Sequence, residues 1–221
     1  MNPAATSREM QEKRNWMRVL GVDPAAAGPT GYGIVESDGR ECRLLHYGAL
    51  KIPTKRREES EGAALQEVHE LLCRLIGEFA PNVIAVESIF SALNVRTVLR
   101  LAEVRGVVLL AAAQHGLAVH SYAPRQVKAS IAGHGHADKR QMQIMVRAIL
   151  SMSTTPEPPD AADALAVALC HLQTEQARRR FGLPHLKELA GVRSPAAQTG
   201  TSGVRINRAT RGGLPRILSA W

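Results

Sequence analysis

Two short apolar runs of this 221-residue chain each end in a carboxylate. Residues 18–23 read Arg-Val-Leu-Gly-Val-Asp and end at Asp23, and residues 83–87 read Val-Ile-Ala-Val-Glu and end at Glu87. Apolar runs of this length, bounded by Gly and Pro, are typical of buried strands. If the two strands are neighbours, both acids lie at the same end of a sheet, where open α/β sheets bind their ligands.

Two more acids stand at the start of a predicted helix. Asp160 and Asp163 are three residues apart, so on a helix they project from the same face. An aspartate at a helix start also caps the helix and complements its dipole, and taken alone this pair favours capping over chemistry. Together with Asp23 and Glu87, however, the pair predicts a cleft in which four carboxylates meet.

Four carboxylates in one cleft repel each other and raise each other's pKa unless a cation lies between them. Mg²⁺ binds one or two carboxylates, keeps several waters and completes its shell with phosphate oxygens of a substrate. Two such ions about 4 Å apart can activate a water on one side of a phosphodiester and stabilise the leaving oxygen on the other. The acids therefore permit metal-dependent phosphodiester hydrolysis.

The remaining patterns predict an α/β domain with a mixed five-stranded central sheet flanked by helices. Gly31 and Gly33 in the run 30–35 are expected to let the chain reverse tightly beside its first strand. The predicted elements are strands at 18–23, 30–35, 42–52, 83–87 and 117–122, and helices at 62–79, 95–115, 124–131, 138–150 and 161 to about 176. The helix 95–115 is apolar nearly all round, so it is either sandwiched inside the domain or forms a subunit interface.

Charge divides the chain into three parts. The net charge is +8, and residues 174–221 account for +7 of it while residues 17–173 are neutral. We expect a domain at 17–176, a basic and largely disordered tail at 177–221, and an N-terminal extension at 1–16 that is disordered or precedes a true start at Met17. The tail suggests a polyanionic partner, although a solubilising role explains it equally well.

Neither a membrane span nor a signal peptide is predicted, so a cytoplasmic location is expected. The three cysteines form no CxxC pair, which favours reduced thiols over a zinc site.

The order and spacing of the motifs resemble the RuvC family of Holliday-junction resolvases, which have a ribonuclease-H-like fold. The similarity runs from Met17 to about His171. It rests on residues 21–24 (Gly-Val-Asp-Pro), 30–33 (Thr-Gly-Tyr-Gly), 86–90 (Val-Glu-Ser-Ile-Phe), 94–106, 125–128 (Arg-Gln-Val-Lys), 133–139 and 160–166. Each motif is weak alone, whereas their order and spacing together are highly specific.

The resemblance implies a homodimeric, Mg²⁺-dependent endonuclease that resolves four-way junction DNA by paired symmetric nicks in recombination and repair. It implies two Mg²⁺ ions per site with Mn²⁺ as a substitute, RuvA and RuvB as branch-migration partners, and no membrane. By motif match, the metal-binding catalytic acids are Asp23, Glu87, Asp160 and Asp163, and the DNA-contacting residues are Phe90, Lys128 and Lys139. The helix 95–115 matches the family's dimer-forming element.

The chain departs from the family pattern at several positions. The loop after Asp23 is one residue longer than usual and lacks the glycine that normally follows Asp-Pro. Leu93 stands where lysine is common, residues 102–104 (Ala-Glu-Val) replace glycine-glutamine-alanine, and His134 and His136 lie in a loop with fewer histidines in the family.

Two other function classes stay open. Sugar-kinase and Hsp70-like ATPases share the ribonuclease-H-like core, but they need two duplicated domains and this chain has room for one. A junction-binding relative with impaired catalysis is the second alternative, which the altered loop after Asp23 favours and the presence of all four acids disfavours.

Overall fold

The computed structural model describes residues 16–26, 28–51, 62–88 and 94–184. Its centre is a five-stranded sheet in the order β3-β2-β1-β4-β5. The strands are β1 (Met17–Asp23), β2 (Thr30–Ser37), β3 (Cys42–Leu50), β4 (Val83–Glu87) and β5 (Ala118–Tyr122). The first three strands pair antiparallel, whereas β1–β4 and β4–β5 pair parallel. The prediction of a mixed five-stranded sheet is therefore confirmed.

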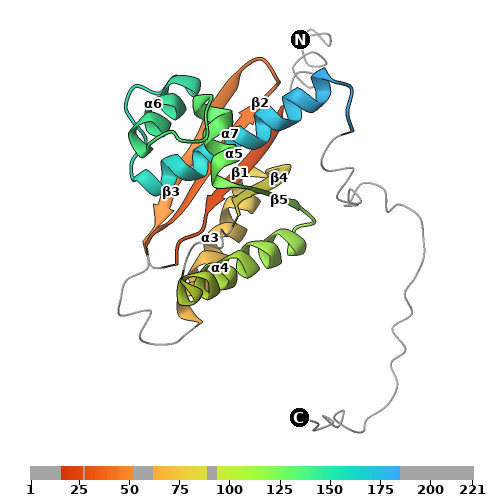
Figure 1. The fold of residues 1–221 in the computed structure, drawn as a ribbon. Coiled ribbons are helices and arrows are strands. Elements are labelled where there is room, and N and C mark those ends of the chain that lie inside the picture. Colours follow the sequence, from red (N-terminus) through yellow and green to blue (C-terminus); the bar gives the residue numbers. More distant parts are fainter. Residues whose placement is uncertain (1–15, 27, 52–61, 89–93, 185–221) are drawn as a thin grey trace, which may run out of the picture.

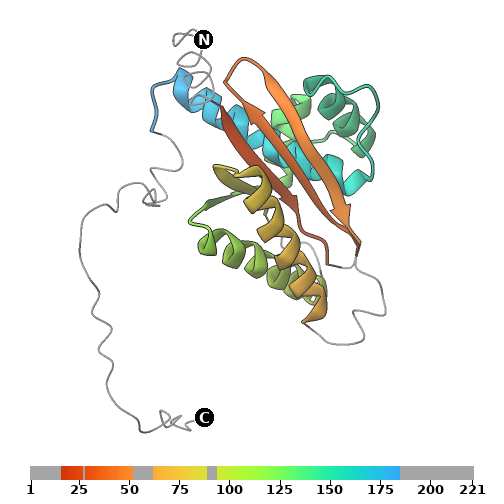
Figure 2. The same cartoon turned by 180° about the vertical axis from the view of Figure 1, so that it is seen from behind.

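Helices cover both faces of the sheet, as Figures 1 and 2 show from opposite sides. One face packs against α3 (Ala63–Phe79) and α4 (Val95–Gln114). The other packs against α5 (Pro124–Ala132), α6 (Lys139–Ile149) and α7 (Pro159–Arg180). In the described part of the chain, no helix is both long and apolar enough to cross a bilayer.

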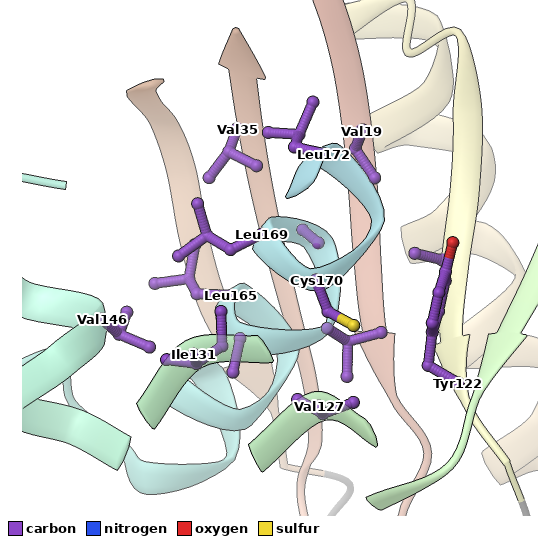
Figure 3. Packing of buried hydrophobic residues seen from close by; sticks show 14 of the residues in the cluster. Val19, Val35, Tyr122, Val127, Ile131, Val146, Leu165, Leu169, Cys170 and Leu172 are labelled. Carbon is purple, nitrogen blue, oxygen red and sulfur yellow. The ribbon is translucent and has the colours of Figure 1, made fainter. Parts of the chain in front are cut away.

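The helix α7 is the centre of the second core. Leu165 and Leu169 are fully buried, and Figure 3 shows Val127 and Ile131 of α5 and Val146 of α6 packed around them. Contacts join α7 to every strand of the sheet and to both neighbouring helices. Because α7 is packed on all sides, its first turn is held in a fixed position relative to the strand ends.

Glycines of β1 and β2 let α7 lie directly on the sheet. Gly21 and Gly33 are register partners, and Gly31 is paired with Asp23. A side chain at Gly21 would overlap the carbonyl oxygen of Ala164, and one at Gly31 would overlap that of Asp160. Positive φ occurs at other glycines of the described chain but not at Gly31 or Gly33. The prediction that these two permit a tight reversal was therefore wrong, since they make room for a helix instead.

The helix α4 has two different faces. Val104, Val108, Ala111 and Ala112 are buried against the sheet and α3. The opposite face is solvent-exposed and apolar, formed by Val95, Leu99, Ala102, Gly106, Leu109, Leu110 and Ala113, which we call the α4 stripe. Of the two alternatives that the sequence left open, burial of the whole helix inside one domain is excluded.

The other elements agree with the predicted ranges to within a few residues, and α7 continues four residues beyond the expected end at 176. Residues 1–15 and 185–221 lie outside the described residues, and so do the expectations made for them.

Candidate active site

Two neighbouring parallel strands place the first two predicted acids side by side. Val22 of β1 is the register partner of Val86 of β4, and Asp23 and Glu87 are the next residues of the two strands. Both side chains are half-buried. The buried apolar residues before them fix the strands, so the carboxylates are fixed at the edge of the sheet where the strands end.

The first turn of α7 adds Asp160 and Asp163. The N-cap of this helix is Pro158, and no side chain caps it. The capping role considered for Asp160 is therefore wrong. Since Gly31 lies against the backbone of Asp160 and pairs with Asp23, the start of α7 is held directly beside the end of β1. The macrodipole favours acids at this position, which reduces the cost of placing them near other carboxylates.

Burial and mutual repulsion raise the pKa of the strand-end acids. Burial raises the pKa of Asp23 to about 8, and the charges of Glu87, Asp163 and Asp160 add to the shift. Burial, followed by repulsion from Asp163, also raises the pKa of Glu87. The negative charges of Glu87, Asp160 and Asp163 therefore act on Asp23, and that of Asp163 acts on Glu87, as expected of carboxylates that can share a cation.

Two predicted lysines stand in the same cleft. Lys139 Nζ lies 3.2 Å from Asp163 Oδ2, and the charge of Lys128 lowers the pKa of Glu87 in opposition to burial. The cleft has a volume of about 210 Å³ and is lined by Glu87, Pro124, Val127, Lys128, Lys139, Met142, Asp163, Ala166 and Val167. One side of it is thus charged and the other is apolar.

Not every predicted feature of the site is seen in the structure. In the described parts of the chain, no three His, Cys, Asp or Glu side chains are close enough to hold a metal ion as they stand. Phe90 lies outside the described residues. The apolar wall with Met142 was not predicted, although Met142 follows Lys139 by one helical turn and therefore faces the same side of α6.

The raised pKa of Asp23 predicts that metal-free protein loses stability as the pH rises. The folded state holds the proton up to about pH 8, whereas an unfolded aspartate releases it near its ordinary value of 3.8. Stability therefore falls between about pH 4 and pH 8. We expect melting temperatures in EDTA to decline across this range, and the decline to be smaller in Asp23→Asn. An equal decline in both proteins would contradict the raised pKa.

The sheet order, the two strand-end acids and the acidic first turn of α7 define the protein as one with a ribonuclease-H-like nuclease fold. A family model described as "Crossover junction endodeoxyribonuclease RuvC" matches residues 19–171, so the chain belongs to the RuvC family. Nucleases of this family are in general metal-dependent.

Individual relatives agree with this assignment. RuvC of Chloroflexus aggregans is 46% identical over 167 residues, which cover 76% of this chain and 99% of that protein. RuvC of Natranaerobius thermophilus is 42% identical over 165 residues, covering 75% of this chain and 100% of that protein. The structure of T. thermophilus RuvC in complex with Holliday junction substrate is similar with a TM-score of 0.67 and 35% identity, covering 73% of this chain and 96% of that one.

Proposed function

We propose that this chain is an Mg²⁺-dependent endonuclease that resolves four-way DNA junctions by paired symmetric nicks. The observation on which the proposal rests is the group of electrostatically coupled carboxylates from β1, β4 and α7 in a protein of the RuvC family. Recombination and repair are the processes in which such junctions arise, and the cytoplasm is the compartment we propose. The free thiols of Cys42, Cys73 and Cys170 are compatible with that compartment.

The donor set supports a hard divalent cation. Asp23, Glu87, Asp160 and Asp163 offer only carboxylate oxygens, which suit Mg²⁺ and Mn²⁺ and do not favour the softer metals that thiolates select. We propose that these four acids hold two ions, and a bound ion would supply activation of a water and stabilisation of the leaving oxygen. Asp163 Oδ2 lies 3.2 Å from Lys139 Nζ, and we propose that this ion pair opens when Asp163 binds an ion.

The lysines have a complementary role in this proposal. Lys128 and Lys139 bring positive charge to the cleft that holds Glu87 and Asp163, where a phosphate would otherwise meet only negative charge. We assign them to the phosphates that flank the cut. Phe90, three residues after Glu87, is proposed to stack on an unpaired base of the junction.

Incubation with a synthetic four-way junction tests the function. With Mg²⁺ or Mn²⁺ we expect two symmetric nicks in opposed strands, and with EDTA or Ca²⁺ we expect binding only. Binding with no cutting under any metal would identify an impaired relative, and ATP turnover without junction binding would overturn the assignment. Linear duplex of the same sequence serves as the substrate control.

We also propose a homodimer, which the exposed face of α4 supports. The α4 stripe runs the length of the helix, and Leu110 and Leu99 are 52% and 59% exposed. Small residues at Ala102, Gly106 and Ala113 let a second helix approach closely. An apolar face of this length is costly in water, and we propose that it packs against its own copy.

Leu110→Glu is expected to convert the dimer to a monomer, because the new carboxylate would be buried without a partner in the interface. Analytical ultracentrifugation measures the change. Ile144→Glu is a matched control, because Ile144 lies on α6 and is 49% exposed. A Leu110→Glu protein that sediments as a dimer, or a monomeric wild type at micromolar concentration, would contradict the proposed interface.

The branch-migration proteins RuvA and RuvB are proposed as further partners on the basis of family membership alone. Co-sedimentation of this chain with a RuvAB–junction complex, compared with the junction alone, tests that part of the proposal.

A further inference from the structure

A buried hydrogen bond joins β5 to α7. Tyr122 Oη and His171 Nδ1 are 2.6 Å apart, and the two residues are 3% and 1% exposed. Their rings meet edge to face, with the ring centroids 5.8 Å apart. Figure 3 shows Tyr122 beside the part of α7 that carries Cys170. Because water does not reach either group, the hydrogen bond is stronger than one at the surface.

Each partner of this hydrogen bond is directly connected to an acid of the proposed metal site. Tyr122 is the last residue of β5 and the register partner of Glu87, and its carbonyl oxygen accepts a 2.8 Å hydrogen bond from the backbone amide of Ser88. His171 follows Asp163 by eight residues in one uninterrupted helix, or about 12 Å along the helix axis. The hydrogen bond therefore links the strand end that carries Glu87 to the helix that carries Asp163.

The two linked elements carry charges that repel each other. Burial raises the pKa of Glu87, and the charge of Asp163 adds to that rise. While no cation lies between the two acids, this repulsion acts to separate the end of β4 from the start of α7. The contacts of α7 with the sheet are concentrated on β1 and β2. A direct link on the β5 side therefore opposes the separation.

The environment of His171 indicates a role beyond packing. Burial lowers the pKa of His171 to about 4, and the neighbouring His120 adds to the shift, so the ring is neutral at physiological pH. The rings of His120 and His171 are stacked with centroids 5.1 Å apart, and among the described residues the buried Nε2 atom of each has no hydrogen-bond partner. An unpaired buried polar atom costs stability, which an apolar side chain at position 171 would avoid.

Resting on the proposed function, we infer that Tyr122 and His171 are positioning residues for the metal site, whose hydrogen bond keeps Glu87 and Asp163 within reach of the same divalent ions. A site with its ligands already in place binds more tightly, because binding does not have to bring them together. Without the link, the two acids move apart in the metal-free protein. The loss of one hydrogen bond shifts such an equilibrium about three- to tenfold.

Tyr122→Phe tests the link, because it removes the phenol oxygen and keeps the ring. Binding of Mn²⁺ to the full chain is measured without DNA, from the electron paramagnetic resonance signal of the free ion. We expect the Mn²⁺ dissociation constant of the variant to be about three- to tenfold higher than that of the wild type. Excess Mn²⁺ should restore junction cutting. An unchanged dissociation constant would overturn the inference.

Ile76→Val is the control for a loss of stability alone. It removes one methyl group from the core on the opposite face of the sheet, at a cost in stability similar to that of a lost hydrogen bond. This variant should melt at a lower temperature than the wild type and bind Mn²⁺ equally well. An equal weakening of Mn²⁺ binding in Ile76→Val and Tyr122→Phe would show that the metal site responds to any destabilisation, and would exclude a positioning role.

The double variant Tyr122→Phe/His171→Leu separates stability from positioning within the same contact. Replacing both partners by apolar groups leaves no unpaired nitrogen at position 171, so the melting temperature should recover relative to Tyr122→Phe. Mn²⁺ binding should remain as weak as in Tyr122→Phe, because no directional link remains. Wild-type Mn²⁺ affinity in the double variant would overturn the inference and leave the nuclease assignment in place. Failure of the wild type to bind Mn²⁺ would overturn the proposed metal site, and this inference with it.

Discussion

Asp23→Asn is expected to reduce junction cutting by at least about 100-fold while junction binding in EDTA stays the same or becomes slightly tighter. The amide keeps the size of the side chain but loses the negative charge that a divalent ion needs. Asp23 is the most strongly perturbed acid of the site, with a pKa raised to about 8 by burial and by three neighbouring carboxylates. Its removal relieves that repulsion, so the variant should also melt at a higher temperature at pH 8.

Asp138→Asn is the control for this variant. Asp138 is an exposed acid at the N-cap of α6, next to Lys139, and asparagine caps helices as well as aspartate does. The control should therefore fold and cut normally. Single-turnover kinetics with excess protein separate cutting from binding. Cutting by Asp23→Asn at the rate of Asp138→Asn would show that the metal assignment is wrong.

Gly31→Ala is expected to destabilise the protein by about 1–3 kcal/mol and to reduce cutting more than this loss explains. A methyl group at this position would overlap the backbone carbonyl of Asp160. The start of α7 must then move away from β2, and the carboxylates of α7 move with it. Because the phosphate contacts proposed for α5 and α6 are elsewhere, junction affinity should change little.

Gly77→Ala is the appropriate comparison. Gly77 lies in α3 with open space around its Cα, and alanine favours helices over glycine by roughly 0.5–1 kcal/mol. This variant should be slightly more stable and fully active. Thermal melts and single-turnover cutting, measured well below both melting temperatures, decide between the outcomes. A Gly31→Ala protein with wild-type stability and rate would show that α7 tolerates displacement.

The strand-end acids were predictable because two local signals coincide there. An apolar run bounded by Gly and Pro identifies each strand. The acid that ends the run is the last residue of the strand, so it lies where the strand ends. Asp23 and Glu87 lie next to each other because β1 and β4 pair in parallel. The alternation of strands and helices along the sequence favours that pairing.

Contacts between distant segments were not predictable in the same way. The helix α7 can pack closely on the sheet because Gly21 and Gly31 lie against backbone carbonyls more than 120 residues away in the sequence. No local sequence pattern distinguishes such a glycine from a glycine in a turn. The ion pair between Lys139 and Asp163 likewise depends on the packing of α6 beside α7. The sequence could not show which face of α4 is buried and which is exposed, because both faces are apolar.

The position of α7 in the chain also has a consequence for biosynthesis. It is the last described element to leave the ribosome, yet it contributes two of the four acids and the centre of one core. A nascent chain that has not yet released α7 lacks half of the proposed metal ligands and leaves one face of its sheet bare. If these four acids are the metal ligands, nuclease activity requires the completed fold, and a partly made chain with an uncovered sheet face is prone to aggregate.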